Sequence, residues 1–356
     1  YEFMIDFKNL KKIERSSTPD NRNFKIGLRT DRNEKVVNWP VSIFKKIFSK
    51  IQPHEFTAYY NTTEVEKIKK NVASYFKIKK NNFIINHGGD GVIKEFLLLH
   101  HKKNLKVLIN GCNYGMYYVY FKALKIKFLE IPYKIDLKIK NLFNLDKDFL
   151  KKNIKKSDII FITNPNQISN KDISINEMRQ MCKKYPKKIF FIDESYADFG
   201  QNSFIYLTKK YKNIYVMRSI TKSFGLASAR IGFLIAHNNT IKSFKALETP
   251  YPLSLFSGKC LNYFVLNKKL IKDYNKLVAN GRKFICDKLR KLQYKVHDST
   301  GLSILIYFEN RKNLNKKYNL LKKKYIYTKK LTYKKYDFLR ITCGPTSNMK
   351  KILKHL

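Results

Sequence analysis

Thiols and tryptophan are scarce in this chain of 356 residues, which has five cysteines and a single tryptophan. The cysteine count is odd, the cysteines are far apart and no Cys-x-x-Cys pair occurs, so neither a disulfide framework nor a thiol zinc site is indicated. Unpaired thiols are typical of a reducing compartment, and we expect a cytoplasmic protein. Neighbouring His100 and His101 belong to no His-x-x-x-His pattern or acidic cluster, so we expect no bound metal.

Several other features are missing, and each absence excludes a class of protein. The sequence shows no signal-peptide pattern and no apolar run of the roughly 20 residues that a membrane span needs, so we expect no membrane partner. The Gly-x-x-x-x-Gly-Lys loop that cradles nucleotide phosphates is absent, as is the Gly-x-Ser-x-Gly elbow of hydrolases.

Acidic residues are also few: 27 aspartates and glutamates stand against 73 lysines and arginines, which gives a formal net charge of +46. Taken alone, such an excess predicts a polyanionic partner. However, the basic residues are scattered in pairs and triplets along the chain and are not gathered into one tail or stripe. No helix-turn-helix, zinc-finger or RNA-recognition signature is present, so we expect no specific nucleic acid partner.

Apolar runs of strand length recur along the chain, and helical patterns lie between several of them. The runs cover residues 83–86, 106–110, 126–131, 158–163, 188–193 and 214–217. Strands that alternate with helical crossovers predict an α/β fold with a mostly parallel sheet and helices on both faces. Ligands of such sheets bind at the carboxyl ends of the strands. After residue 251 the pattern becomes mainly helical over 254–292 and ends in strands near 303–308 and 338–344, which indicates a smaller α+β domain.

One lysine, Lys222, lies in a turn between two apolar runs, residues 214–217 and 230–235. Most lysines of so basic a chain are solvated charges, but the surroundings of this one are unusual. Arg230 follows closely, and hydroxyl residues crowd the lysine: Ser219, Thr221 and Ser223. Hydroxyls with an arginine suit a phosphate, and a lysine held away from water can form a Schiff base. A nucleophilic lysine beside a phosphate clamp indicates pyridoxal phosphate.

The stretch from Ser219 to Phe233, Ser-Ile-Thr-Lys-Ser-Phe-Gly-Leu-Ala-Ser-Ala-Arg-Ile-Gly-Phe, resembles the cofactor-lysine signature of fold-type I, pyridoxal-phosphate-dependent aminotransferases. It is most similar to the branch that contains histidinol-phosphate aminotransferases and threonine-phosphate decarboxylases. The resemblance implies a fold-type I transferase in which Lys222 binds pyridoxal 5'-phosphate as a Schiff base. It also implies that Ser219, Thr221 and Arg230 contact the cofactor.

Other segments match the family in the same order along the chain. The run Phe-Phe-Ile-Asp-Glu-Ser-Tyr, which ends at Tyr196, brings an acid to the end of a strand, where a carboxylate needs a partner. The resemblance implies that Asp193 pairs with the protonated ring nitrogen of the cofactor and that Tyr196 donates to its ring oxygen. Tyr114 matches the tyrosine that stacks on the cofactor ring, and a core tyrosine is the alternative.

Two loops supply further cofactor contacts by resemblance. The turn His-Gly-Gly-Asp-Gly after residues 83–86 offers backbone N–H groups at a helix start, and it matches the family's phosphate-binding turn, so Gly89 and Asp90 are candidates through their backbone. The stretch 163–170 resembles Asn-Pro-Asn-Asn-Pro-Thr-Gly, but Gln167 stands where an asparagine bonds the ring oxygen, and the second proline and the glycine are lost. The ring-oxygen contact therefore either survives with shifted geometry or is lost.

Residues from other parts of the chain complete the expected site. Arg340 lies inside an apolar run, where a buried cation needs a partner, and the resemblance implies that it binds the substrate α-carboxylate. Lys329 falls near a family arginine that contacts the substrate phosphate, although a lysine is a point charge and not a fork. Tyr60 matches a tyrosine that reaches the cofactor phosphate of the partner subunit, which implies a homodimer with a shared active site. A packed aromatic is the alternative for Tyr60.

By the same resemblance, residues 42–250 form the large cofactor-binding domain. The N-terminal arm, residues 1–41, joins residues 251–356 in the smaller part, and we expect residues 31–34 to line the entrance to the site.

Three functional hypotheses follow. The first is a pyridoxal-phosphate-dependent aminotransferase that acts on a small anionic, phosphorylated amino or keto substrate. The second shares the cofactor but decarboxylates a phospho-amino acid of the threonine-phosphate or serine-phosphate type, and no residue of the sequence decides between the two. The third is a degenerate fold that binds polyanions without catalysis, against which the retention of Lys222, Asp193 and the expected tyrosines argues.

Overall fold

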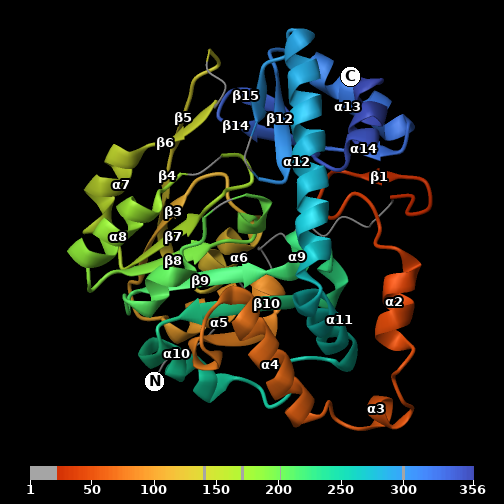
Figure 1. The fold of residues 1–356 in the computed structure, drawn as a ribbon. Coiled ribbons are helices and arrows are strands. Elements are labelled where there is room, and N and C mark those ends of the chain that lie inside the picture. Colours follow the sequence, from red (N-terminus) through yellow and green to blue (C-terminus); the bar gives the residue numbers. More distant parts are fainter. Residues whose placement is uncertain (1–21, 139–141, 170–171, 201, 299–300) are drawn as a thin grey trace.

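The computed structural model describes residues 22–138, 142–169, 172–200, 202–298 and 301–356. Two parts of the sequence predictions lie outside the described residues: residues 1–21 of the expected arm, and Asn170 at the end of the expected ring-oxygen loop. Figure 1 shows a large sheet below and a smaller sheet, drawn in blue, above it. The long helix α12 (Lys268–Lys291) runs alongside both.

The large sheet has seven strands in the order β2-β10-β9-β8-β7-β3-β4. They are β2 (Phe83–His87), β3 (Lys106–Asn110), β4 (Lys127–Ile131), β7 (Ile159–Thr163), β8 (Ile189–Asp193), β9 (Ile214–Ser219) and β10 (Ile231–Ala236). Strands β9, β8, β7, β3 and β4 pair in parallel, whereas β10 runs antiparallel to both of its neighbours. The predicted mostly parallel sheet is therefore confirmed.

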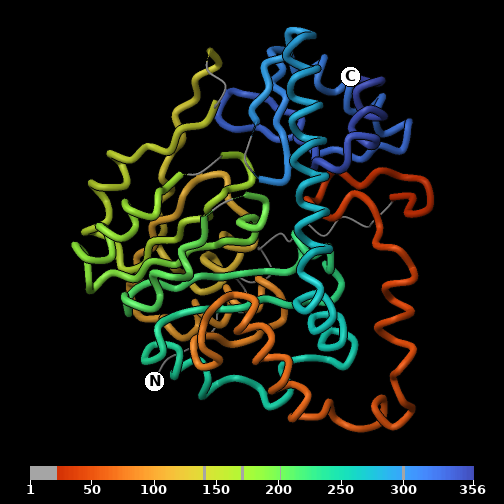
Figure 2. Tube along the Cα trace, in the orientation of Figure 1, coloured from red at the N-terminus to blue at the C-terminus, as the bar shows by residue number. Residues whose placement is uncertain are grey.

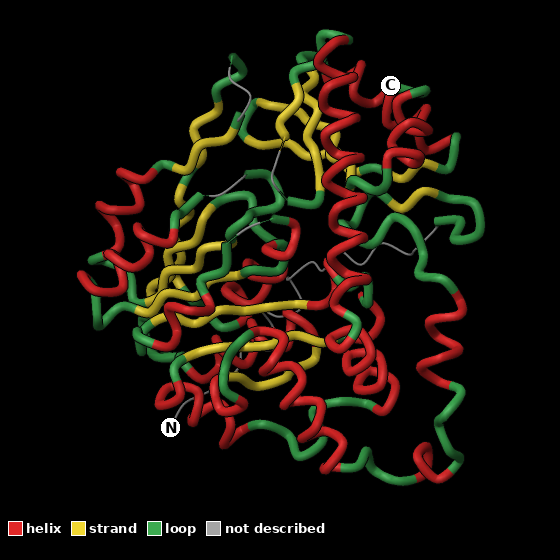
Figure 3. The backbone as a smooth tube through the Cα atoms, in the orientation of Figure 1, coloured by secondary structure: helices red, strands yellow, loops and turns green. Residues whose placement is uncertain are grey.

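Helices cover both faces of this sheet. Successive residues of a strand point to opposite sides, so each buried strand contributes apolar side chains to a core on either face. Phe191 and Met217 belong to the core on one face, and Ile192 and Val216 belong to the core on the other. The helices of the first face are α5 (Gly88–Leu99), α6 (Gly115–Ala123) and α10 (Asn238–Leu247); those of the second include α4 (Thr62–Phe76), α7 (Lys147–Ile154), α8 (Ile175–Lys184) and α11 (Leu255–Leu266). Figure 3 shows these helices in red on either side of the yellow strands.

A four-stranded antiparallel sheet forms from the C-terminal region, in the order β11-β12-β15-β14. Its strands are β11 (Val296–Asp298), β12 (Ser303–Phe308), β14 (Lys329–Tyr333) and β15 (Tyr336–Thr342), and α12, α13 (Arg311–Lys323) and α14 (Thr346–Leu353) pack on it. The helical stretch expected over 254–292 is two helices, α11 and α12, which meet at Asn267 where the backbone is non-helical, with φ −102° and ψ 46°. The α+β character of this region is confirmed, whereas the domain boundaries near residues 41 and 250 stay a prediction.

The first described residues lie against the C-terminal region, far away in the sequence, as the red and blue segments of Figure 2 show. Strand β1 (Leu28–Arg29) pairs in parallel with β13 (Ile326–Tyr327). The N–H of Thr342 in β15 donates to the Thr30 carbonyl oxygen at 2.8 Å. The segment 31–39 that follows leads to α2 (Val41–Phe48) and α3 (His54–Thr57).

Further short elements are the antiparallel pair β5 (Tyr133–Ile135) and β6 (Phe143–Leu145), and the single turn α9 (Ile220–Ser223) after β9. Four 3-10 helices also occur within the described residues: η1 (Lys80–Asn82), η2 (Ala197–Phe199), η3 (Ile205–Lys209) and η4 (Ala227–Ala229). Among the helices of the described segments, none combines the length and the apolar character that a membrane crossing requires.

Candidate active site

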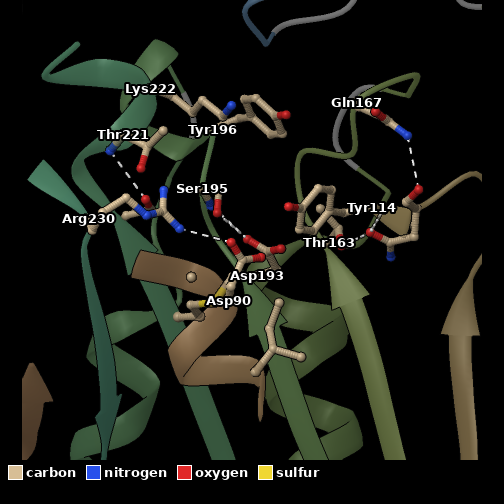
Figure 4. A pocket seen from close by; sticks show the side chains of 15 residues that line it. Asp90, Tyr114, Thr163, Gln167, Asp193, Ser195, Tyr196, Thr221, Lys222 and Arg230 are labelled. Atoms are coloured by element: carbon tan, nitrogen blue, oxygen red, sulfur yellow. Dashed lines mark hydrogen bonds and ion pairs between the residues drawn. The ribbon is translucent and has the colours of Figure 1, made fainter. Parts of the chain in front are cut away.

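A cavity opens at the carboxyl ends of β7, β8 and β9, beside the start of α5, where an open parallel sheet is expected to bind ligands (Figure 4). Ten residues predicted from the sequence line it: Gly89, Asp90, Tyr114, Gln167, Asp193, Tyr196, Ser219, Thr221, Lys222 and Arg230. Five more residues contribute that the sequence argument missed: Ile93, Asn113, Thr163, Ser195 and Met217. Most of the residues predicted from the sequence therefore lie together at this one cavity.

Asp193 ends β8 and is 5 % exposed. One carboxylate oxygen accepts hydrogen bonds from the backbone N–H and the hydroxyl of Ser195, at 2.9 and 2.7 Å, and the other accepts from the Tyr117 hydroxyl at 3.0 Å. Within the described residues no cation lies at ion-pair distance from it. Burial raises the pKa of Asp193, while these hydrogen bonds and the charge of Lys222 act in the opposite direction. Asp193 is therefore a buried acid that faces a cavity without a charge partner.

Ser195 lies two residues after Asp193, which is the spacing at which an aspartate closes a turn onto a backbone N–H. This spacing was the available sequence signal for Ser195. Tyr117 gave no comparable signal, because its contact with Asp193 depends on how α6 packs on the sheet.

Lys222 lies in α9 and is half-buried. Its ammonium group donates to the carbonyl oxygen of Arg32 at 3.1 Å. The turn that carries it is fixed by Ser219, whose hydroxyl accepts the backbone N–H of Thr221 at 3.2 Å. Lys222 and Asp193 thus line one cavity from the ends of the neighbouring strands β9 and β8.

The hydroxyl of Tyr196 is held by the N-terminal segment. The side-chain amide of Asn33 donates to it at 2.9 Å, and Asn33 also exchanges two hydrogen bonds with Thr342 of β15, at 2.9 and 3.1 Å. Asn33 has φ +55°, a left-handed conformation that asparagine tolerates better than most residues. Sequence reasoning placed residues 31–34 at the entrance, and the structure adds that Asn33 joins Tyr196 to β15.

The start of α5 and the start of β10 meet at the other end of the cavity. The Arg230 guanidinium forms an ion pair with the Asp90 carboxylate at 2.9 Å. Gly88 has φ +72°, and a Cβ there would stand 2.7 Å from the Arg230 guanidinium nitrogen. Gly232 lies under the same turn, because a Cβ at that position would stand 2.5 Å from the Gly88 carbonyl oxygen. Gly89 and Asp90, in the first turn of α5, line the cavity, and the backbone N–H groups at the start of a helix suit an anion.

Tyr114 precedes α6 and is 49 % exposed at the cavity. Its backbone N–H donates to the side chain of Asn113 at 2.8 Å, and Asn113 also accepts from the Thr163 hydroxyl at 2.8 Å. The turn is thus fixed while the aromatic ring remains available, which agrees with a stacking role and not with a core position.

Gln167 lines the cavity as predicted, but its side chain is already engaged. The amide nitrogen donates to the carbonyl oxygens of Cys112 and Asn113 at 2.8 and 3.1 Å. The amide oxygen accepts from the Arg340 guanidinium at 2.8 Å. A second guanidinium nitrogen of Arg340 donates to the Asp31 carbonyl oxygen at 2.5 Å.

Arg340 is 6 % exposed and lies next to the cavity through Gln167. Its Nε atom is buried without a hydrogen-bond partner, and no carboxylate in the described parts of the chain lies at ion-pair distance from it. Burial lowers the pKa of Arg340. Arg340 is therefore a second buried charge at this site that lacks an ionic partner.

Two predicted residues lie away from the cavity. Lys329 is exposed on β14 and is the direct cross-strand neighbour of Arg340, so the two side chains share a face of the small sheet. Tyr60 is buried in its own chain, its ring lies where a Cβ on Gly258 would collide with it, and its hydroxyl has no partner. The predicted contact of Tyr60 with a partner subunit and that of Lys329 with a substrate phosphate stay predictions.

The side chains fit pyridoxal phosphate. The unpaired buried Asp193 suits a protonated ring nitrogen, and the N–H groups at the start of α5 suit the phosphate. Tyr114 offers a ring face, and Lys222 offers the amine. In the described residues no group of three potential metal ligands lies together.

Comparison with known proteins agrees with this reading of the cavity. The sequence profile described as "Aminotransferase class I and II" matches residues 36–356. A histidinol-phosphate aminotransferase of Thermotoga sp. (strain RQ2) is 25 % identical over 328 residues, 91 % of each chain.

Two solved structures share the fold. The histidinol-phosphate aminotransferase of Sinorhizobium meliloti, in complex with pyridoxal-5'-phosphate, superposes with a TM-score of 0.80 at 16 % identity and covers 93 % of this chain and 90 % of its own. The L-threonine-O-3-phosphate decarboxylase of Porphyromonas gingivalis superposes with a TM-score of 0.74 at 13 % identity and covers 92 % and 97 %. The profile match over most of the sequence, with a cavity built as that cofactor requires, shows that the chain belongs to the class I and II aminotransferase family of pyridoxal-phosphate-dependent enzymes.

Proposed function

We propose that this aminotransferase acts on a small phosphorylated amino or keto substrate of the histidinol-phosphate type. The observation that carries the proposal is Arg340, a buried cation without an ionic partner beside the cavity of Lys222 and Asp193. A buried guanidinium is costly unless an anion reaches it. The relatives named histidinol-phosphate aminotransferase support the phosphorylated substrate class.

In this proposal each residue of the site has its own role in the reaction. When bound, the cofactor supplies a carbonyl that condenses with amines and a ring that accepts electrons. Asp193 keeps negative charge at the ring nitrogen, and Lys222 holds the cofactor and then moves a proton at the substrate α-carbon. Arg340 orients the carboxylate or phosphate of the substrate. Lys329, on the same face of the sheet, adds a positive charge for the phosphate.

A second copy of the chain completes the active enzyme in this proposal. Phe56, Tyr59, Tyr251 and Phe256, here named the aromatic surface, are all exposed, and Tyr59 is 79 % exposed. The Tyr59 and Tyr251 rings stack with centroids 4.5 Å apart, and the Phe56 and Phe256 centroids are 5.6 Å apart. Large exposed aromatic groups of this kind mark interaction sites. All five cysteines are free thiols, which supports a cytoplasmic location for the dimer.

The test begins with the visible spectrum of the protein after incubation with pyridoxal phosphate. Borohydride reduction and peptide mapping should then place the label on Lys222, and a label on another lysine would overturn the assignment. The control variant Lys151→Ala, at an exposed position of α7, should be labelled like the wild type.

The reaction is then assigned by two assays run side by side. Transfer of an amino group from glutamate to a phosphorylated keto acceptor is the expected result. Release of carbon dioxide from a phospho-amino acid without amino transfer would establish the decarboxylase alternative instead.

A further inference from the structure

We propose that this protein has a second ligand site, a cavity beside the turn of Lys222 that binds a small anion carrying an aromatic ring. The cavity has a volume of about 800 Å³, within the range of small-molecule sites. It lies between parts of residues 22–44 and parts of residues 225–260. Its described lining residues include none of those that line the cavity of Lys222 and Asp193. The proposal does not depend on the proposed function, because it uses no step of the reaction.

Two cations at this cavity have no ionic partner. Lys35 is 6 % exposed, and its Nζ atom lies 3.7 and 2.9 Å from the ring centroids of Trp39 and Tyr274. The Arg29 guanidinium donates to Oδ1 of Asn38 at 2.7 Å and to the Lys35 carbonyl oxygen at 3.4 Å, which are both neutral acceptors. In the described part of the chain no carboxylate lies at ion-pair distance from either cation. A buried cation is costly unless an anion reaches it.

The cavity carries an excess of positive charge. Glu34 is the one acidic side chain among its described lining residues, and Arg22 forms an ion pair with it at 3.1 Å. Arg29 and Lys35 therefore line the cavity without an acid that neutralises them. Burial lowers the pKa of Lys35 to about 7, and an anion bound nearby would stabilise its charged form. The charge pattern thus selects an anionic ligand.

The walls of the cavity also offer aromatic rings and hydroxyl groups. Phe24 and Phe256 are 54 % and 49 % exposed, so each leaves part of its ring open to a ligand. The hydroxyls of Ser254 and Ser257 lie 2.8 Å apart at the same cavity. Aromatic rings bind flat groups by stacking, and apolar walls with a few polar groups are typical of a site for an organic ligand. This lining favours an organic anion with a ring over a bare inorganic ion.

The cavity adjoins the turn that carries Lys222. Gly225, three residues after Lys222, lines the cavity, and a Cβ on Gly225 would collide with the Lys35 side chain. The indole N–H of Trp39 donates to the Phe224 carbonyl oxygen at 2.7 Å, which fixes the indole at the cavity and against the Lys35 amine. Trp39 is the single tryptophan of the chain, so its fluorescence reports on this cavity.

The test is a titration of the cofactor-loaded protein with adenosine 5'-monophosphate, followed by the emission of Trp39. The titration is run at about pH 6.5, below the pKa of Lys35 and above the second pKa of a phosphate, about 6. We expect a saturable change in emission. Adenosine and inorganic phosphate each carry half of the recognised chemistry, so each should bind at least about tenfold more weakly. A wild-type protein without a saturable change, or with equal affinity for inorganic phosphate, would overturn the proposal.

Two variants locate the site. Lys35→Met keeps the apolar stem and removes the amine, and Arg29→Gln removes the guanidinium charge. Each should raise Kd for adenosine 5'-monophosphate about ten- to a hundredfold, because one charge-assisted hydrogen bond is lost. Lys151→Ala, exposed on α7, is the control and should bind like the wild type. Far-ultraviolet circular dichroism should show that each variant is folded.

A third variant separates this cavity from that of Lys222. Arg340→Gln removes a cation beside the cavity of Lys222 and should leave Kd, measured by Trp39 emission, unchanged. Loss of binding in Arg340→Gln, with wild-type binding in Lys35→Met and Arg29→Gln, would place the nucleotide in the candidate active site and refute the second site. Absence of amino transfer by the wild-type protein would refute the proposed function and leave the binding result standing.

Discussion

Asp193 and Asp172 are two buried carboxylates of the large-sheet region that have different surroundings. Asp193 faces the cavity and is bonded to Ser195 and Tyr117. Asp172 is enclosed by protein groups, among them Asn110, which donates to it at 3.1 Å, and the Tyr133 hydroxyl. The first acid can therefore act on a ligand, whereas the second can act only on the stability of the fold.

Asp193→Asn keeps the shape of the side chain and removes its negative charge. We expect kcat for amino transfer to fall by about 10²- to 10³-fold, the usual loss when one electrostatic partner of the reacting group is removed. Steady-state kinetics with saturating cofactor measures the effect. Asp148→Asn, exposed on α7, is the matched control, and equal kcat values for the two variants would contradict the role of Asp193.

Asp172 should make stability depend on pH in a predictable direction. Burial raises the pKa of Asp172 to about 6, above about 3.9 in an unfolded chain. Between these pH values the folded protein holds a proton that the unfolded chain has released. The unfolding free energy attributable to this group therefore falls as pH rises from about 4 to about 6, by roughly 3 kcal/mol.

Asp172→Asn cannot titrate and should lose this dependence. We expect the unfolding free energy of the variant, relative to the wild type, to increase over the same pH range. Urea unfolding at several pH values measures the difference, in which the other titrating groups cancel. Parallel pH profiles for the two proteins would show that Asp172 does not titrate there.

At the scale of elements, the strands were the most predictable part of the fold. The observed bounds of β3 (Lys106–Asn110) and β12 (Ser303–Phe308) equal the predicted ones, because each is an apolar, β-branched run that ends at turn-forming residues. The mostly parallel character of the sheet followed from the helical crossovers between the runs, whereas the strand order and the antiparallel direction of β10 were not predicted. The lysine, the acid and the glycine turn were placed together because they follow strand ends and a family motif.

The missed contacts depend on tertiary packing. Nothing in the sequence near Asn33 indicates that it bonds Tyr196 and Thr342, which are far from it in the chain. The local pattern around Tyr60 likewise could not show that its ring packs on Gly258. Sequence reasoning recognised that Gln167 departs from the motif, but only the three-dimensional structure shows what its amide binds.

The approach of β10 to the turn before α5 gives a prediction at this scale. Gly232→Ala would place a methyl group 2.5 Å from the Gly88 carbonyl oxygen and 2.9 Å from the Gly89 nitrogen. The turn must move, so we expect a loss of about 1–3 kcal/mol in unfolding free energy, as for overpacking elsewhere, together with weaker cofactor binding. Gly115→Ala, which meets no atom within 4 Å, is the control. A variant as stable as the control, with unchanged cofactor affinity, would argue against the close packing.

For the whole molecule, the charge and the aromatic surface oppose each other. Two chains of formal charge +46 repel at low ionic strength, whereas burial of Tyr59 and its neighbours favours association. At an ionic strength of 0.1 M, salt largely screens the repulsion between charges that lie more than about 10 Å apart. We therefore expect dimerisation to strengthen between low and moderate salt, as measured by sedimentation equilibrium.

Tyr59→Asp should shift that equilibrium towards the monomer and lower activity at the same protein concentration. Leu292→Asp, at another exposed apolar residue just after α12, controls for the added charge and should remain dimeric. A Tyr59→Asp protein that sediments as the wild type does would place the interface elsewhere.

The segment 31–34 has a practical consequence for expression design. The profile match begins at residue 36, yet Asp31, Arg32 and Asn33 contact Arg340, Lys222 and Tyr196. A protein expressed from residue 36 onwards would keep every side chain proposed to contact the cofactor. It would lose the residues that bond Arg340, Lys222 and Tyr196. Such a truncation should bind pyridoxal phosphate poorly, and its failure would reveal the importance of the leading segment and not a defect in the catalytic domain.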